Sequence, residues 1–270
     1  MKCEICPHHC NITEGKIGIC HAWTLKDGLL TSKNYGRITS LALDPIEKKP
    51  LYHFYPGSRI LSIGSFGCNL NCPWCQNDSI SRGEAESVFL LPEEIVQKAK
   101  ELVPEGNIGI AFTYNEPMIC PDFIADTAKM ARQEGLKTVL VTNGMITAKA
   151  HEMFLPFIDA YNIDLKSAYV QSYQSIGGDL EAVTDTIRRA DEKAHVEATT
   201  LIVPGFNDTE EEMIAIAKII ASINPEIVLH VTRFFPAGRM KQTPPTDVKK
   251  VYRFAKIARE YLPSVYTGNC

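Results

Sequence analysis

The sequence contains no long run of hydrophobic residues. No stretch approaches the ~18 consecutive apolar residues that a membrane-spanning helix needs. The first residues, Met-Lys-Cys-Glu-Ile-Cys, lack the apolar segment of a secretory signal. We therefore expect a cytoplasmic protein with no membrane segment.

The sequence also has no large excess of charge of either sign. Lys and Arg number 28 against 32 Asp and Glu, so the net charge is −4 with His neutral. This balance gives no general attraction to anionic lipid or nucleic acid, and nucleic-acid binding is not expected. Low-complexity stretches and close internal repeats are missing as well. A chain with 45% hydrophobic and 22% charged residues is typical of a globular protein.

From residue 59 onward, apolar β-branched runs alternate with helical patterns. This alternation predicts an α/β fold with a parallel sheet and six βα units. The expected strands are 59–65, 107–114, 137–142, 160–166, 195–204 and 227–234. Residues 59–270 therefore form the main predicted domain.

Residues 1–58 differ in composition and form a short Cys-rich extension before that domain. They are rich in Cys, His, Lys, Gly and Pro and have only short apolar runs. A segment this small needs a metal or docking against its neighbour to be stable. Its last part, residues 44–58, is a charged and aromatic loop that either is anchored by Tyr52 and Phe54 or guides a substrate.

The nine cysteines are concentrated near the beginning of the chain. In a reducing cytoplasm, metal ligation and catalysis are commoner uses of cysteine than disulfide bonds. Cys120 and Cys270 stand apart from the others. The remaining seven are Cys3, Cys6, Cys10, Cys20, Cys68, Cys72 and Cys75.

Three of these cysteines follow the first predicted strand with the spacing Cys68-x3-Cys72-x2-Cys75. Three thiolates on one short loop can hold three irons of a [4Fe-4S] cluster and leave the fourth iron open to a substrate or cosubstrate. A zinc site with a fourth ligand from elsewhere is the alternative. The position favours the cluster, because active-site loops follow the strands of parallel βα folds.

With Trp74 before the third cysteine, this spacing resembles the Cys-x3-Cys-x-aromatic-Cys motif of the radical SAM superfamily. The resemblance implies a partial (β/α)6 TIM-like barrel, a [4Fe-4S] cluster at the three cysteines and S-adenosylmethionine (SAM) on the open iron, with Trp74 beside the cofactor. It further implies reductive cleavage of SAM to a 5′-deoxyadenosyl radical, which abstracts hydrogen from a substrate. An electron donor such as flavodoxin or ferredoxin is then required.

Two later strands end in polar residues that resemble SAM-binding elements of the superfamily. Asn115 and Glu116 stand where the superfamily has Gly-Gly-Glu-Pro, although Tyr114 and Asn115 replace both glycines. The resemblance assigns them to the methionyl amino group, whereas the residues alone also fit a turn before a helix. Thr142 and Asn143, in Thr-Asn-Gly, resemble a ribose-binding and carboxylate-binding element of glycyl-radical activases.

Three further residues resemble cosubstrate contacts of the same branch. Asp164 and Lys166 are two apart and so lie on one face of a strand, where they suit a hydroxyl and a carboxylate or else neutralise each other. His230 lies in an apolar strand, where a lone histidine is also a common core residue.

The remaining cysteines, Cys3-x2-Cys6-x3-Cys10-x9-Cys20, supply four thiols that would close a second metal site. Spacing alone does not distinguish structural zinc from an auxiliary iron–sulfur cluster, because thiolate binds both, and metal-free thiols remain a third interpretation.

The segment with these four N-terminal cysteines, together with residues 44–58 and Cys75-Gln76-Asn77, resembles the AmmeMemoRadiSam system radical SAM enzyme family. The resemblance covers almost the whole chain. The resemblance implies Memo-like and AMMECR-type protein partners and leaves the substrate unidentified. Two alternatives stay open. One is an activase that acts on a glycine of a partner enzyme, and the other is a non-catalytic zinc-binding scaffold.

Overall fold

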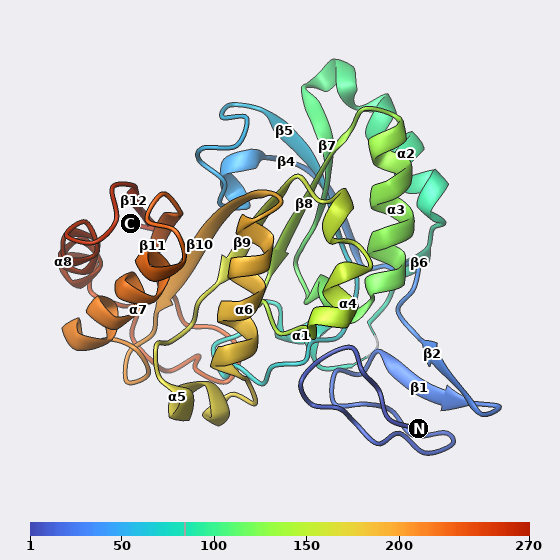
Figure 1. The fold of residues 1–270 in the computed structure, drawn as a ribbon, viewed down its shortest axis with the longest axis horizontal. Helices are drawn as coiled ribbons and strands as arrows, with labels where there is room; N and C mark the ends of the chain where they lie inside the picture. Colours follow the sequence, from blue (N-terminus) through green and yellow to red (C-terminus); the bar gives the residue numbers. More distant parts are fainter. Residues whose placement is uncertain (84) are drawn as a thin grey trace.

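A computed structural model describes residues 1–83 and 85–270, and an eight-stranded sheet forms its centre (Figure 1). The strand order is β12-β11-β10-β9-β8-β7-β5-β4. All neighbours are parallel except β4 and β5, which are antiparallel. The strands are β4 Ser40–Pro45, β5 Arg59–Gly64, β7 Asn107–Phe112, β8 Lys137–Thr142, β9 Ala160–Asp164, β10 His195–Ile202, β11 Val228–Arg233 and β12 Val265–Gly268.

The six predicted strands are confirmed as β5 and β7 to β11, and with them the α/β class and the parallel sheet. Two edge strands, β4 and β12, were not predicted. Because β4 lies within residues 1–58 and pairs with β5, the extension contributes a strand to the main sheet. The division of the chain at residue 58 stays a prediction.

Helices cover the outer face of the sheet (Figure 1). The longer helices α2, α3, α6, α7 and α8 bury apolar residues three and four apart, as α6 does with Val183, Ile187 and Ala190. Side-chain caps fix several starts, including Asp179 at α6 and Thr209 at α7. The helices are α1 Asp78–Ser81, α2 Pro92–Glu101, α3 Pro121–Gln133, α4 Ala148–Glu152, α5 Val170–Ser175, α6 Leu180–Asp191, α7 Glu210–Ile223 and α8 Val248–Ala258. No described helix is both long and apolar enough to cross a lipid bilayer.

The loop of residues 46–58 fills the end of the barrel at which the parallel strands begin. Its Ile46, Leu51 and Phe54 pack on the first inward-facing residues of the neighbouring strands. The Pro50 carbonyl accepts a hydrogen bond of 2.7 Å from Asn162 Nδ2 on β9. The loop is therefore an anchored connection at the end of the barrel opposite the cysteine loop.

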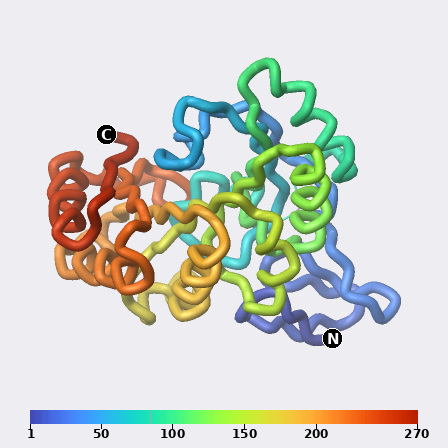
Figure 2. Tube along the Cα trace, turned by 45° about the horizontal axis from the view of Figure 1, so that its top comes forward, coloured from blue at the N-terminus to red at the C-terminus, as the bar shows by residue number. Residues whose placement is uncertain are grey.

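Residues 1–33 fold beside the other end of the barrel, around the hairpin of β1 Trp23–Lys26 and β2 Leu29–Ser32. A two-stranded pair of β3 Arg37–Ile38 and β6 Val88–Phe89 follows. The Trp23 indole donates a hydrogen bond of 2.6 Å to the Ile119 carbonyl, which ties the hairpin to the segment after β7. The two chain ends lie on opposite sides of the molecule in both views (Figure 2).

Candidate active site at the cysteine loop

The loop with Cys68, Cys72 and Cys75 leaves the carboxyl end of β5 and runs to α1. Gly67 bends it with φ +90°, and a Cβ atom there would stand 2.5 Å from the Cys20 carbonyl oxygen. Only glycine combines this backbone conformation with so close an approach. The local sequence thus positions the three thiols at the end of the sheet where chemistry is expected.

The three thiols lie in a largely buried environment with few polar contacts. Leu70 N–H and Asn143 Nδ2 donate to Cys68 Sγ at 3.4 and 3.6 Å, and Cys75 Sγ–H donates to Ser81 Oγ at 3.7 Å. Burial raises the pKa of the Cys68 and Cys72 thiols, so a bound cation is needed to hold them as thiolates. Three thiols on one short loop, with N–H donors at Cys68, form a donor set suited to an iron–sulfur cluster.

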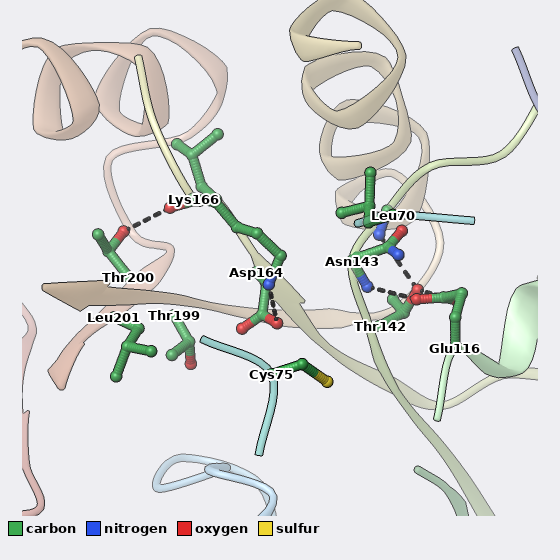
Figure 3. A network of polar contacts seen from close by, with 12 residues as sticks. Leu70, Cys75, Glu116, Thr142, Asn143, Asp164, Lys166, Thr199, Thr200 and Leu201 are labelled. Carbon is green, nitrogen blue, oxygen red and sulfur yellow. Dashed lines mark hydrogen bonds and ion pairs between the residues drawn. The ribbon is translucent and has the colours of Figure 1, made fainter. Parts of the chain in front are cut away.

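Glu116 organises the next part of the site, at the end of β7 (Figure 3). It is 3% exposed, and its two oxygens accept hydrogen bonds from Thr142 Oγ1 at 2.6 Å, Asn143 N at 2.7 Å and Met118 N at 2.9 Å. Burial raises the pKa of Glu116 to about 7, although these hydrogen bonds oppose the rise. The structure thus brings Glu116, Thr142 and Asn143 together, as strands ending at one edge of a sheet predict.

Asn115 contacts the cysteine loop rather than an open space. Its Oδ1 accepts from Ser65 N at 2.9 Å, and its Nδ2 donates to the Phe66 and Gly67 carbonyls at 3.2 and 3.1 Å. Asn115 therefore fixes the backbone immediately before Cys68. Its assignment to the SAM amino group stays a prediction.

Asp164 and Lys166 form an ion pair at the end of β9, with Lys166 Nζ 2.8 Å from Asp164 Oδ2 (Figure 3). Their side chains are 35% and 16% exposed, which leaves them accessible from inside the barrel. Burial alone would lower the pKa of Lys166, but the charges of Asp164 and Cys72 raise it overall. The two residues share a face, as the strand alternation predicts, and Lys166 stays cationic.

The other two predicted cofactor residues have protein partners. Trp74 is 5% exposed and its ring lies 4.4 Å from that of Phe206. His230 Nε2 lies 2.6 Å from Glu197 Oε2, and its ring contacts Tyr52 at 4.7 Å. Nothing in these contacts tests their roles with SAM, which stay predictions.

Two residues important to these contacts were missed by sequence reasoning. Glu197 lies on β10 with no exposed surface and accepts hydrogen bonds from two histidines and two backbone N–H groups. A charged residue inside an apolar strand is a signal that could have found it. Asn69, 1% exposed, joins the cysteine loop to Asn143 and gives no comparable signal in the sequence.

The four remaining cysteines, Cys3, Cys6, Cys10 and Cys20, line a separate cavity beside Trp23 and Ile119. Across residues 1–83 and 85–270, no three Cys, His, Asp or Glu side chains surround one point closely enough to hold a single metal ion. This holds for the four N-terminal thiols and for the three of the cysteine loop.

A comparison with known families shows to which superfamily the chain belongs. The model of the radical SAM superfamily matches residues 62–220, which include the cysteine loop, Glu116 and the Asp164–Lys166 pair. The chain belongs to the radical SAM superfamily. Membership supports an enzyme with a [4Fe-4S] cluster and SAM-cleaving chemistry.

Individual relatives agree with this assignment. An uncharacterised protein of Methanocaldococcus jannaschii is 37% identical over 275 residues, which cover 100% of this chain and 81% of that protein. The pyruvate formate-lyase-activating enzyme of Clostridium pasteurianum is 27% identical over 162 residues, 58% of this chain and 67% of that enzyme. A domain of the pyruvate-formate lyase-activating enzyme from Bacteroides vulgatus has a similar fold, with a TM-score of 0.52, 19% identity, and coverage of 60% of this chain and 99% of that one.

Proposed function

We propose that this radical SAM protein cleaves SAM reductively at a [4Fe-4S] cluster held by Cys68, Cys72 and Cys75, and abstracts hydrogen from a substrate. The observation that carries the proposal is the three-thiol loop at the end of β5, within the span that matches the superfamily. Held by Cys68, Cys72 and Cys75, a cluster would supply the one electron that cleavage of SAM into methionine and a 5′-deoxyadenosyl radical requires, and the substrate would supply the hydrogen atom.

The residues around the loop support specific roles in binding SAM. Lys166 presents a cationic amine to the inside of the barrel and suits the methionyl carboxylate, while Asp164 accepts hydrogen bonds from hydroxyl groups. Glu116 binds Thr142 and Asn143 and so fixes the wall on which the methionyl amino group would rest. We assign Trp74 and His230 to supporting contacts, because both side chains already pack against protein partners.

Product analysis of anaerobic, iron-reconstituted protein tests this function directly. With dithionite and SAM, the wild-type protein should produce 5′-deoxyadenosine and methionine, and Cys68→Ala should abolish production. Cys120→Ser is the matched control, because Cys120 is a buried cysteine outside both groups and should leave production unchanged. Full activity of Cys68→Ala, or a wild-type protein that binds zinc and makes no 5′-deoxyadenosine, would contradict the proposal.

A second candidate function, supported by the names of relatives, is activation of a glycyl-radical enzyme. The Clostridium pasteurianum relative is named an activating enzyme for pyruvate formate-lyase. In this version the hydrogen atom comes from a backbone glycine of a partner protein, which then holds a stable radical. A glycyl-radical EPR signal that requires both proteins and SAM would favour activation. Cleavage of SAM without such a signal, with every partner tested, favours another substrate.

Two kinds of partner follow from this proposal. The reductive step needs a low-potential one-electron donor of the flavodoxin or ferredoxin class. The resemblance to the AmmeMemoRadiSam family adds Memo-like and AMMECR-type proteins as candidates for the substrate complex. Addition of each purified protein to the SAM-cleavage assay should accelerate turnover or shift the product if it is a partner.

A further inference from the structure

The four N-terminal thiols converge on one cavity. Its walls are formed by Cys3, Cys6, Cys10 and Cys20 together with mainly apolar neighbours, which include Ile5, Ile12, Trp23 and Ile119. Cys3, Cys6 and Cys20 are each 7% exposed. Four soft donors in an apolar enclosure form a closed ligand set for a thiophilic metal centre.

Backbone N–H groups lie near the sulfur atoms of this cavity. Burial raises the pKa of the Cys3, Cys6 and Cys20 thiols, and the N–H groups of Ile5, His8, Ala22 and Trp23 oppose that rise. N–H donors stabilise thiolate charge and tune the reduction potential of a cluster. The extension therefore supplies both the ligands and the polar contacts around them.

A shared residue connects this cavity to the cysteine loop. The Asn69 carbonyl oxygen lies 2.8 Å from Nε2 of His8, which lines the cavity, and Asn69 Oδ1 accepts from Asn143 Nδ2 at 2.9 Å. The same Asn143 amide donates to Cys68 Sγ at 3.6 Å, and Asn69 follows Cys68 directly in the chain. A chain of polar contacts therefore runs from one group of cysteines to the other.

The arrangement of the four thiols distinguishes a cluster from a single zinc ion. With Zn–S bonds near 2.3 Å, tetrahedral zinc holds four thiolates about 3.8 Å apart. The four thiols here surround a cavity, and among the described residues they do not gather around one point. The three thiols of the Cys68 loop share this open arrangement, and their superfamily uses them for a [4Fe-4S] cluster.

We propose that Cys3, Cys6, Cys10 and Cys20 bind a second [4Fe-4S] cluster, and that Asn69 is the positioning residue between this cluster and the Cys68 loop. The inference goes beyond SAM cleavage, because the second cluster has all four ligands from the protein and no open iron for SAM. Because it lies beside the Cys68 loop, the second cluster is suited to carry single electrons from a flavodoxin-type or ferredoxin-type donor to the first cluster.

Removal of the first cluster isolates the second. A Cys68→Ala, Cys72→Ala, Cys75→Ala triple variant, reconstituted anaerobically, should retain about four iron and four sulfide per chain and the Mössbauer signature of a cubane, against about eight of each in the wild type. In that background, Cys20→Ser should lose the iron, whereas Cys120→Ser should keep it. Zinc bound at one ion per chain with no iron, or no metal at all, would overturn the proposal.

The wild-type protein provides a second route if the triple variant fails to fold. After dithionite reduction it should show two iron–sulfur EPR signals, of which SAM perturbs only one. A single signal with about four irons overturns the second cluster. This test is separate from the test of the proposed function. A protein that retains iron at the N-terminal cysteines but makes no 5′-deoxyadenosine would contradict SAM cleavage and would still support the second cluster.

The role of Asn69 has its own readout. In the triple variant, Asn69→Leu removes a side-chain amide that favours the Cys6 thiolate and should lower the reduction potential of the remaining cluster. Asn71→Leu is the matched control, two residues along the same loop and exposed, and should leave the potential unchanged. Equal potentials in the two variants would refute the assignment of Asn69.

Discussion

His230 Nε2 lies 2.6 Å from Glu197 Oε2, and the two side chains are 2% and 0% exposed. The second oxygen of Glu197 accepts from His195 Nε2 at 2.9 Å and from His53 N at 2.7 Å. Burial alone would raise the pKa of Glu197, but these hydrogen bonds hold it at about 2. This carboxylate therefore fastens the loop of residues 46–58 to the strands of the barrel.

We expect Glu197→Gln to lower the free energy of unfolding by roughly 3 kcal/mol at pH 7, because one pKa unit corresponds to about 1.4 kcal/mol. The folded-state pKa is depressed from 4.5, so this stability is complete above pH 4.5 and is lost as the pH falls towards 2. Urea unfolding at pH 7 and pH 3.5 should show a smaller difference between variant and wild type at the lower pH. Glu226→Gln, at an exposed position, is the control. A difference in the free energy of unfolding between Glu197→Gln and wild type that is equal at both pH values would contradict the assignment.

Lys166→Met should weaken SAM binding. The loss of a charge-assisted hydrogen bond of about 1.5–3 kcal/mol raises the dissociation constant roughly 10- to 100-fold. Equilibrium binding of SAM to the anaerobic protein measures this change. Lys250→Met is the matched control, since Lys250 pairs with Asp208 at 2.6 Å on another element. Equal affinities in both variants would exclude Lys166 from the SAM site.

Gly67→Ala should reduce cluster content and thermal stability more than Gly135→Ala. Both glycines have positive φ, +90° and +71°, so each alanine bears a backbone cost of about 1–2 kcal/mol. Only the Cβ at position 67 meets an atom, the Cys20 carbonyl oxygen, since nothing lies within 4 Å at position 135. Iron analysis and thermal unfolding compare the two, and equal effects would show that the close contact is unimportant.

Lys49→Met should lower the free energy of unfolding by roughly 3 kcal/mol, because it leaves Asp44 without its buried cation. Lys49 is 3% exposed and lies 2.8 Å from Asp44. The adjacent Lys48 is 66% exposed and lies 3.5 Å from the same carboxylate, so Lys48→Met should cost less than about 0.5 kcal/mol. Denaturant unfolding of the two variants at one pH tests this prediction, and equal free energies of unfolding would contradict it.

The sequence predicted features whose signals are local. The six central strands are runs rich in apolar and β-branched residues, and Cys68, Cys72 and Cys75 lie within eight residues, so the local sequence was enough to predict the strands and to single out the three cysteines. The edge strand β12, Val265–Gly268, is short and half-buried and has no such run.

Residues that act through distant contacts escaped prediction for the same reason. Glu197 receives hydrogen bonds from Tyr52 and His53, which lie 145 and 144 positions away in the chain. Asn69 meets Asn143 across 74 positions. Both partnerships exist only after the strands assemble, so the neighbouring residues in the chain do not identify the partners of either residue.

Residues 46–58 pack across the end of the barrel at which the parallel strands begin and are fastened there to β9. Along the barrel axis, a substrate therefore approaches Asp164 from the end that carries the cysteine loop.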